Sequence, residues 1–301
     1  MAYTNPGKRF LERFGPVRDH ADVMRYVEFL RAEAGLGVDP PIDLSLIYRR
    51  FEIPPPALAP LPGLQGLLVN SEQGIIFINE RDIPLRRRFT EAHELIELLF
   101  AAQPLGKGWA ARRIGGFKPD TKEQLCNEGA AELLMPRDSF APRLKIMGIS
   151  FQTAHLLAQE YKMSTTAALV QMVRVGKGHH AVVLWRMKNK PMEIRQRVSE
   201  AQLSLFGETT GQMPRKKLRV EWSFGQSDTP FIPRDKSVSE DTSIYAAYRD
   251  SAFTIGMDSL DFGPVAGKFK TENQPFESDG ERQVVSLLHL HSNEVECGGA
   301  F

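Results

Sequence analysis

The segment RFTEAHELIELLF, Arg88–Phe100, places three ionisable side chains at helical spacing: His93, Glu94 and Glu97. Residues four positions apart share one face of a helix, so His93 and Glu97 would project side by side. Burying both groups without partners would be costly, and a divalent cation bound to both would satisfy them. Glu94 would then lie beside the metal as a base for its water. The alternative is an ion pair between His93 and Glu97 on a core helix.

A second segment, KEQLCNEGAAELLMP at Lys122–Pro136, adds a candidate third ligand. Helical spacing puts Glu123, Cys126 and Asn127 on one face, and the run Gly129–Ala131 lets another helix approach closely. Glu123 is an isolated carboxylate on that face. Asn127, one turn further on, could orient a ligand through a hydrogen bond, with a helix-packing amide as the alternative. Cys126 is interpreted as a small core residue, with a thiolate near the metal as the alternative.

Together, RRRFTEAHE and EQLCNEGAAELLMP resemble the ImmA/IrrE metallopeptidases. In that family one helix carries HExxH, and a later helix carries Glu-x-x-(Ala/Cys)-Asn before Leu-Leu-Met-Pro. The upstream stretch GLLVNSEQGIIFINE also resembles the family, and the resemblance covers roughly residues 20–175. It implies that His93 and Glu123 are metal ligands and that Glu94 is the general base. Glu97 stands where the family carries its second histidine.

The change from histidine to Glu97 alters the expected chemistry of the site. A carboxylate can ligate zinc at a similar distance. One histidine with two carboxylates is a more oxygen-rich set, at which manganese or iron(II) competes better. The extra negative charge would also make a metal-bound water less acidic. We expect one divalent metal held by His93, Glu97 and Glu123, with Zn²⁺ favoured and Mn²⁺ or Fe²⁺ as alternatives.

These residues require an α+β domain to position them. Apolar spacing predicts helices over 19–35 and from Asp43, and two β-rich runs predict a hairpin over 66–79. Further helical patterns lie at Leu85–Phe100, Thr121–Met135, Pro136–Met147, Phe151–Met163 and Thr165–Val175, followed by a β-rich run at His179–Met187. The predicted fold is a zincin-like metallopeptidase domain over residues 1–187, a small antiparallel sheet plus helices. It includes a helix-turn-helix-like extension at about 148–176. A polar, basic linker at 188–214 and a smaller β-rich regulatory or recognition domain at 215–301 follow.

Composition limits the alternatives. A chain of 301 residues can form two domains, and 42% apolar with 25% charged residues is typical of a globular protein. The net charge of +1 gives no overall field that would attract nucleic acid or anionic membranes. Two cysteines, Cys126 and Cys297, argue against a disulfide framework. No signal peptide or membrane span is visible, so we expect a cytoplasmic protein.

One motif in the linker suggests a partner. Gln202, Leu203, Ser204, Leu205 and Phe206 resemble the short peptide by which bacterial replication and repair proteins dock on the sliding clamp. An extended segment with apolar side chains could enter a groove of that protein. The alternative is that these side chains pack on one of the two domains.

Direct binding to nucleic acid has little support. The second helix of the helix-turn-helix-like pair offers only Arg174 as a basic residue. The resemblance implies instead an endopeptidase whose protein substrate is a DNA-binding helix-turn-helix repressor, acting in a stress or mobile-element response. The alternative function is a non-catalytic regulatory binding protein on a peptidase scaffold, docking on the sliding clamp through Gln202–Phe206.

Overall fold

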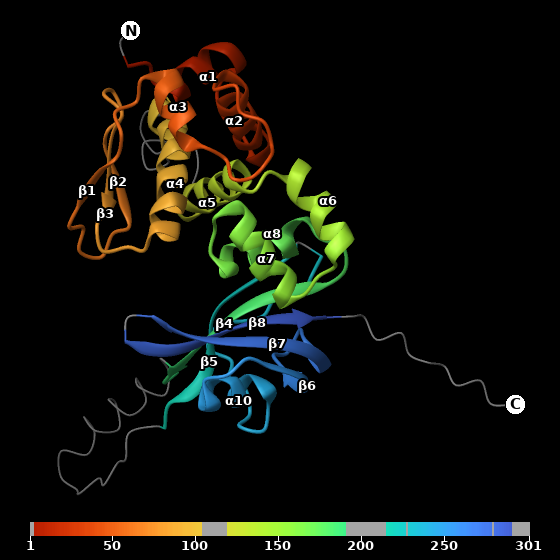
Figure 1. The fold of residues 1–301 in the computed structure, drawn as a ribbon. Helices are drawn as coiled ribbons and strands as arrows, with labels where there is room; N and C mark the ends of the chain where they lie inside the picture. The colour runs from red at the N-terminus through yellow and green to blue at the C-terminus, as the bar shows by residue number, and fades with distance from the viewer. Residues whose placement is uncertain (1–2, 104–118, 191–214, 227, 279, 291–301) are drawn as a thin grey trace, which may run out of the picture. The chain divides into compact units, whose positions relative to one another are not determined.

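The structure, a computed structural model, describes residues 3–103, 119–190, 215–226, 228–278 and 280–290 (Figure 1). The chain divides into two compact units. The first comprises Met1–Gly148 and Thr153–Gln171, and the second comprises Ile149–Gln152 and Met172–Phe301. The predicted boundary at residue 187 therefore lies inside the second unit. The reason is that strand β4, His180–Lys188, pairs with strands from the C-terminal part of the chain.

Helices dominate the first part of the chain. They are α1 Pro6–Phe14, α2 His20–Glu33, α3 Leu44–Phe51, α4 Pro84–Ala102, α5 Pro119–Leu134, α6 Arg137–Met147, α7 Phe151–Tyr161 and α8 Thr165–Val175. Asp43 caps α3 by accepting the Ser45 N–H, at the residue where this helix was expected to begin, and Asp19 caps α2 by accepting the Asp22 N–H. Within the described ranges, no helix combines the length and the apolar character needed to cross a bilayer.

A three-stranded sheet completes the first unit, with strand order β1-β3-β2. Strands β2, Gly66–Asn70, and β3, Ile75–Asn79, form the predicted antiparallel hairpin. Strand β1, Ala57–Ala59, pairs in parallel with β3. The sheet is therefore mixed, and the prediction of a purely antiparallel sheet is wrong. Three residues after a run of prolines carry too little alternation to predict a strand from the sequence.

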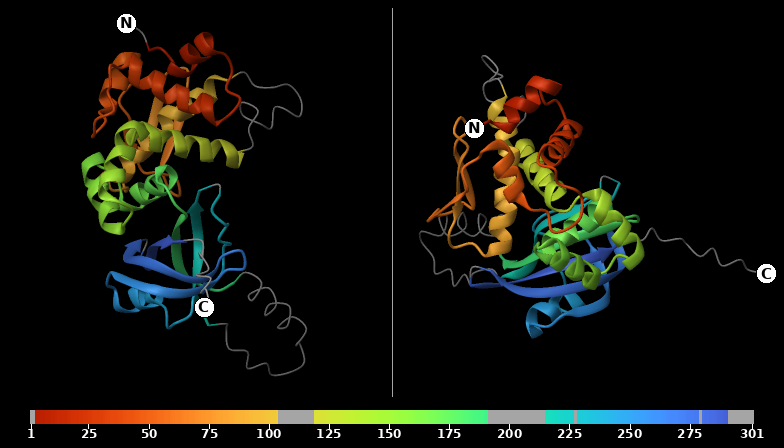
Figure 2. Two further views of the ribbon diagram at one scale, coloured as in Figure 1. Left: turned by 90° about the vertical axis from the view of Figure 1, so that its right-hand side faces the viewer. Right: turned by 45° about the horizontal axis from the view of Figure 1, so that its top comes forward.

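Helix α4 lies at the centre of the first unit, where α1, α2 and α5 pack against it (Figure 2). The Tyr26 hydroxyl of α2 donates to the Leu95 carbonyl of α4 at 3.1 Å. A Cβ added at Gly129 of α5 would lie 3.1 Å from the Ile96 side chain and 3.2 Å from that of Val23. A glycine therefore fits this close approach of α5 to α4 and α2, where a larger residue would displace the Ile96 and Val23 side chains.

This contact predicts the effect of adding bulk to α5. Gly129→Val would overpack the contact with Ile96, and the free energy of unfolding should fall by about 1–3 kcal/mol. Urea denaturation would measure the change. The matched control is Gly37→Val, because Gly37 is exposed and a Cβ there meets no atom within 4 Å. Equal stability of the two variants would contradict close packing at Gly129.

The second unit is built on a five-stranded sheet with strand order β5-β4-β8-β7-β6. Its further strands are β5 Lys217–Gly225, β6 Thr254–Asp261, β7 Ala266–Ser278 and β8 Glu281–His289, and every pairing is antiparallel. Helix α10, Ser243–Asp250, packs on one face of the sheet (Figure 2). Its cap is Thr242, which accepts the Tyr245 N–H at 3.2 Å. The β-rich character of this part of the chain was predicted, but α10 was not.

Polar side chains lie buried where α10 meets the sheet. Asp258 accepts hydrogen bonds from the Ser243 N–H at 2.7 Å and from the Thr271 hydroxyl at 2.7 Å. The Asn273 amide donates to the Ser243 hydroxyl, and its oxygen accepts from Ser286 at 2.6 Å. A buried network with its hydrogen bonds made is stabilising and selects one arrangement of helix and sheet.

A second polar cluster of this unit surrounds Glu272, which is 3% exposed. Its carboxylate contacts the His289 imidazole at 3.0 Å, the Lys270 ammonium at 2.9 Å and the Phe151 N–H at 2.7 Å. The His180 ring lies 5.0 Å from the His289 ring. Burial alone would raise the pKa of Glu272, but these hydrogen bonds outweigh it and lower the pKa from 4.5 to about 2.

A depressed pKa makes a defined contribution to stability. Because Glu272 binds its proton more weakly in the folded state, its stabilising effect is complete above pH 4.5 and is lost as pH falls toward 2. Glu272→Gln should therefore be less stable than wild type near neutral pH, with a difference that shrinks through this window. Urea denaturation at a series of pH values would test this. Glu277→Gln, an exposed position of the same strand, is the control. A difference that stays constant with pH would contradict the assignment.

Candidate metal centre

One side of α4 faces a cleft of about 820 Å³. The residues of α4 that line it recur at helical spacing, and β2 and the first turns of α5 form the other walls. The side chains of His93 and Glu97 are 14% and 22% exposed there. His93 and Glu97 face the cleft, whereas Ala92, Ile96 and Phe100 of the same helix are buried in the core.

His93 is held in one orientation by α5. Its Nδ1 lies 3.1 Å from the Asn127 amide oxygen. Since an amide oxygen only accepts hydrogen bonds, Nδ1 carries the proton and the lone pair is on Nε2. That Nε2 lies 3.8 Å from a Glu123 carboxylate oxygen. The Asn127 amide nitrogen donates to the other Glu123 oxygen at 3.3 Å. Asn127 thus contacts two of the predicted ligands at once.

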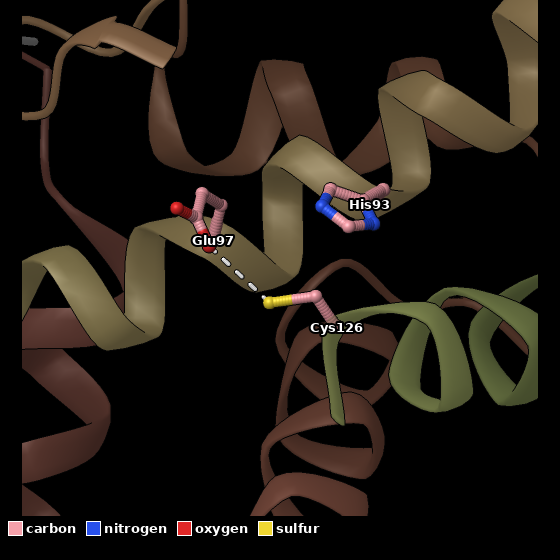
Figure 3. Close-up of side chains that lie close together, drawn as sticks. All are labelled: His93, Glu97 and Cys126. Carbon is pink, nitrogen blue, oxygen red and sulfur yellow. Dashed lines mark hydrogen bonds between the residues drawn. The ribbon is translucent and has the colours of Figure 1, made fainter. Parts of the chain in front are cut away.

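Glu97 has two partners from α5. One oxygen forms an ion pair with the Lys122 ammonium, whose side chain is 13% exposed. The other accepts a hydrogen bond from the Cys126 thiol at 3.2 Å. Figure 3 shows Glu97 and Cys126 meeting between the two helices, with His93 beside them. One ligand atom from each of these three side chains lies within 4.8 Å of the others.

Lys122 was missed in the sequence, although it precedes Glu123 directly. Its positive charge offsets that of Glu97. His93, Glu97, Glu123 and Lys122 together therefore carry one net negative charge, as two neutral histidines and one carboxylate would. The Lys122 ammonium therefore opposes the expected effect of Glu97, which was to make a metal-bound water less acidic.

Glu94 is the most buried carboxylate of the cleft, at 6% exposure. Burial raises its pKa to about 7, and the charge of Glu97 adds to the rise. A backbone hydrogen bond from Leu68 on β2 opposes it. A Cβ added at Gly66 of the same strand would lie 2.8 Å from a Glu94 oxygen. A carboxyl group with a pKa near neutrality can both take up and return a proton at physiological pH.

Cys126 is fully buried. Burial, followed by the nearby charge of Glu97, raises the pKa of the thiol well above its usual range. Cys126 is therefore a protonated thiol, and its S–H donates a hydrogen bond to Glu97.

The donor set suits a divalent metal. Ligands at about 2.1 Å from a tetrahedral ion lie about 3.5 Å apart. His93 Nε2 and the Glu123 oxygen are separated by 3.8 Å, which is close to that spacing. Asn127 supplies the hydrogen bond that metal-binding histidines require on their other nitrogen. Each Glu97 oxygen already accepts one hydrogen bond and keeps a second lone pair with which it can bind a metal.

Comparison with known proteins identifies the segment that carries this cleft. Residues 59–172 match the family model of the IrrE N-terminal-like domain. This segment is thus similar to the IrrE N-terminal-like domain. The predicted resemblance to the ImmA/IrrE family is thereby confirmed, and the matched residues include β2, α4 and α5.

Two known proteins are similar to this chain, one in sequence and one in structure. The radiation response metalloprotease IrrE of Deinococcus deserti is 35% identical over 99 residues, which are 33% of this chain and 35% of that protein. The match thus spans about a third of the relative's length. The structure of a Mycobacterium tuberculosis transcriptional regulator superposes with a TM-score of 0.54 and 13% identity, covering 94% of this chain and 79% of that one. At that identity the likeness concerns the fold alone.

The predicted clamp-docking residues, Gln202–Phe206, lie outside the described residues, as does most of the predicted linker.

The close contact between β2 and α4 generates a prediction for the IrrE N-terminal-like domain. A Cβ at Gly66 would lie 2.4 Å from the Thr90 methyl group, so Gly66→Ala should lower the free energy of unfolding by about 1–3 kcal/mol. Thr90→Ser removes that methyl and keeps the hydroxyl that donates to Arg86. The double variant should therefore recover part of the loss, as a double-mutant cycle in urea denaturation would measure. Strictly additive effects would contradict the contact.

Proposed function

We propose that this chain is a metal-dependent endopeptidase. The observation that carries the proposal is Glu94, a buried carboxyl group with a pKa of about 7, next to His93 in an 820 Å³ cleft. Membership of residues 59–172 in a family that includes a metalloprotease supports the same reaction class.

The proposed roles follow from the positions of the side chains. His93, Glu97 and Glu123 hold one divalent ion, with Zn²⁺ favoured over Mn²⁺ and Fe²⁺. When bound, the metal would polarise the scissile carbonyl and acidify a water molecule. Glu94 accepts the proton of that water and passes it to the departing amine nitrogen. Asn127 keeps His93 in the tautomer that presents Nε2.

The shape of the cleft favours an extended peptide as substrate. Strand β2 lines the cleft and is at the edge of its sheet in the described structure, where it pairs only with β3. An edge strand can take up an extended segment of another chain through backbone hydrogen bonds. Leu67 and Val69, which are 43% and 52% exposed, lie on this strand and offer apolar contacts to the side chains of such a segment.

We propose a helix-turn-helix repressor as the protein substrate, cleaved in the cytoplasm during a stress or mobile-element response. The resemblance to the ImmA/IrrE family supports this substrate class. A similar protein is named for a radiation response. Incubation of the purified chain with repressors of this class, followed by mass spectrometry of the products, would identify a cleaved bond.

A pair of variants separates catalysis from metal binding. Glu94→Gln should lower the rate of peptide hydrolysis by about 100-fold or more while the metal content stays near one equivalent. Glu97→Ala should lose both the metal and the activity. Metal content is measured by mass spectrometry of the purified protein. Glu91→Gln is the matched control, since Glu91 is on the same helix but does not line the cleft.

Two results would overturn the proposal. Hydrolysis that survives Glu94→Gln would show that another group is the base. Absence of bound metal in the wild type, even after addition of zinc, manganese and iron in turn, would refute the peptidase and favour a regulatory binding protein on the same scaffold.

A further inference from the structure

The thiol of Cys126 occupies a position where a metal ion would find a ligand. Its sulfur is 3.2 Å from a Glu97 oxygen, and both atoms belong to the group that His93 completes (Figure 3). Glu97 alone accounts for the hydrogen bond that the Cys126 thiol donates. A cysteine that only packs in a core does not usually have an imidazole, here that of His93, so close to this pair. A histidine, a carboxylate and a cysteine this close together form a metal-binding set.

We propose that Cys126 is a ligand of the metal, which therefore sits in a sulfur-containing site formed by His93, Glu97 and Cys126. The inference rests on the proposed metal-dependent function and adds a ligand to it.

The present spacing of Cys126 and Glu97 already suits one shared ion. Metal bonds of about 2.3 Å to sulfur and 2.1 Å to oxygen span a 3.2 Å separation at an angle of about 90°. The incoming ion takes the place of the thiol proton in the Cys126–Glu97 hydrogen bond, and that proton passes to solvent. Closure of the group from 4.8 Å to the spacing of tetrahedral ligands needs a shift of about 1 Å.

The local charges are suited to this exchange. Lys122 pairs with the other oxygen of Glu97, so it can stay in place when the metal arrives. With Cys126 deprotonated, Lys122 and a bound divalent ion together more than offset the two negative charges of Glu97 and the thiolate. Without Lys122, a thiolate beside Glu97 would be opposed by the repulsion of two like charges at short range.

The sulfur ligand changes the expected metal. Thiolates favour zinc over manganese and iron(II), so Cys126 counteracts the oxygen-rich character that Glu97 and Glu123 give the site. Glu123 is 65% exposed, whereas Cys126 is buried. A catalytic zinc ion needs one position open to water or substrate. Glu123 is accordingly the ligand that leaves the metal when water or substrate binds, and Cys126 stays bound.

Titration of the reduced, full-length chain with Co²⁺ tests the assignment, because a thiolate bound to cobalt gives a near-ultraviolet charge-transfer band. We expect the band in the wild type, in Glu123→Ala and in Cys297→Ser, the control for the only other cysteine of the sequence. Cys126→Ser should lack the band and bind zinc about 10-fold or more weakly, with its ratio of zinc to manganese affinity reduced. Circular dichroism would verify that each variant is folded.

The outcomes separate this inference from the proposed function. Cobalt binding by the wild type without the band, or a band that persists in Cys126→Ser, would overturn the role of Cys126 and leave the peptidase intact. Failure of the wild type to bind cobalt or zinc would overturn both.

Discussion

The close approach of α4 and α5 is the constraint on which the candidate centre depends. His93, Glu94 and Glu97 come from one helix, whereas Lys122, Glu123, Cys126 and Asn127 come from the other. At Gly129, two residues beyond Asn127, the two helices are separated by little more than the Ile96 side chain. Side-chain contacts of about 3 Å between the helices, such as that of His93 with Asn127, exist only because the backbones are this near. Gly129, which has no reactive side chain, thus sets the distance between the functional side chains of α4 and those of α5.

Charge within the cleft is balanced locally. Glu97 adds a carboxylate to the cleft, and the adjacent Lys122 neutralises it. Removing either side chain alone would change the net charge around a bound ion by one unit. Glu94 experiences the remaining negative field together with burial, and both raise its pKa. The acidity of the proposed base is therefore set in part by residues that do not touch the substrate.

Much of this arrangement could be predicted from local patterns, and the remainder depends on distant partners. The spacing within α4 and α5 and the cap Asp43 are local signals, and they predicted these elements correctly. The pairing of β4 could not be predicted from local patterns, because its partner β8 lies about a hundred residues further along the chain. Lys122 lies four residues before Cys126 and shares its face of α5, but the sequence of α5 could not show that its long side chain pairs with Glu97 of α4. The sequence of α5 alone could not show whether Cys126 faces the core or the cleft, because this depends on where α4 lies.

The segment that matches the family packs against helices that lie outside it. Residues 59–172 exclude α1 and α2, although Tyr26 of α2 bonds to the backbone of α4 and Arg31 donates to the Glu132 carbonyl of α5 at 3.1 Å. Gly7 of α1 packs directly on the Leu98 backbone. A fragment cut at the limits of the match would expose this apolar side of α4 to water and invite aggregation. Loss of activity in such a fragment would result from the missing contacts of α1 and α2 with α4. It would not test the residues that line the cleft.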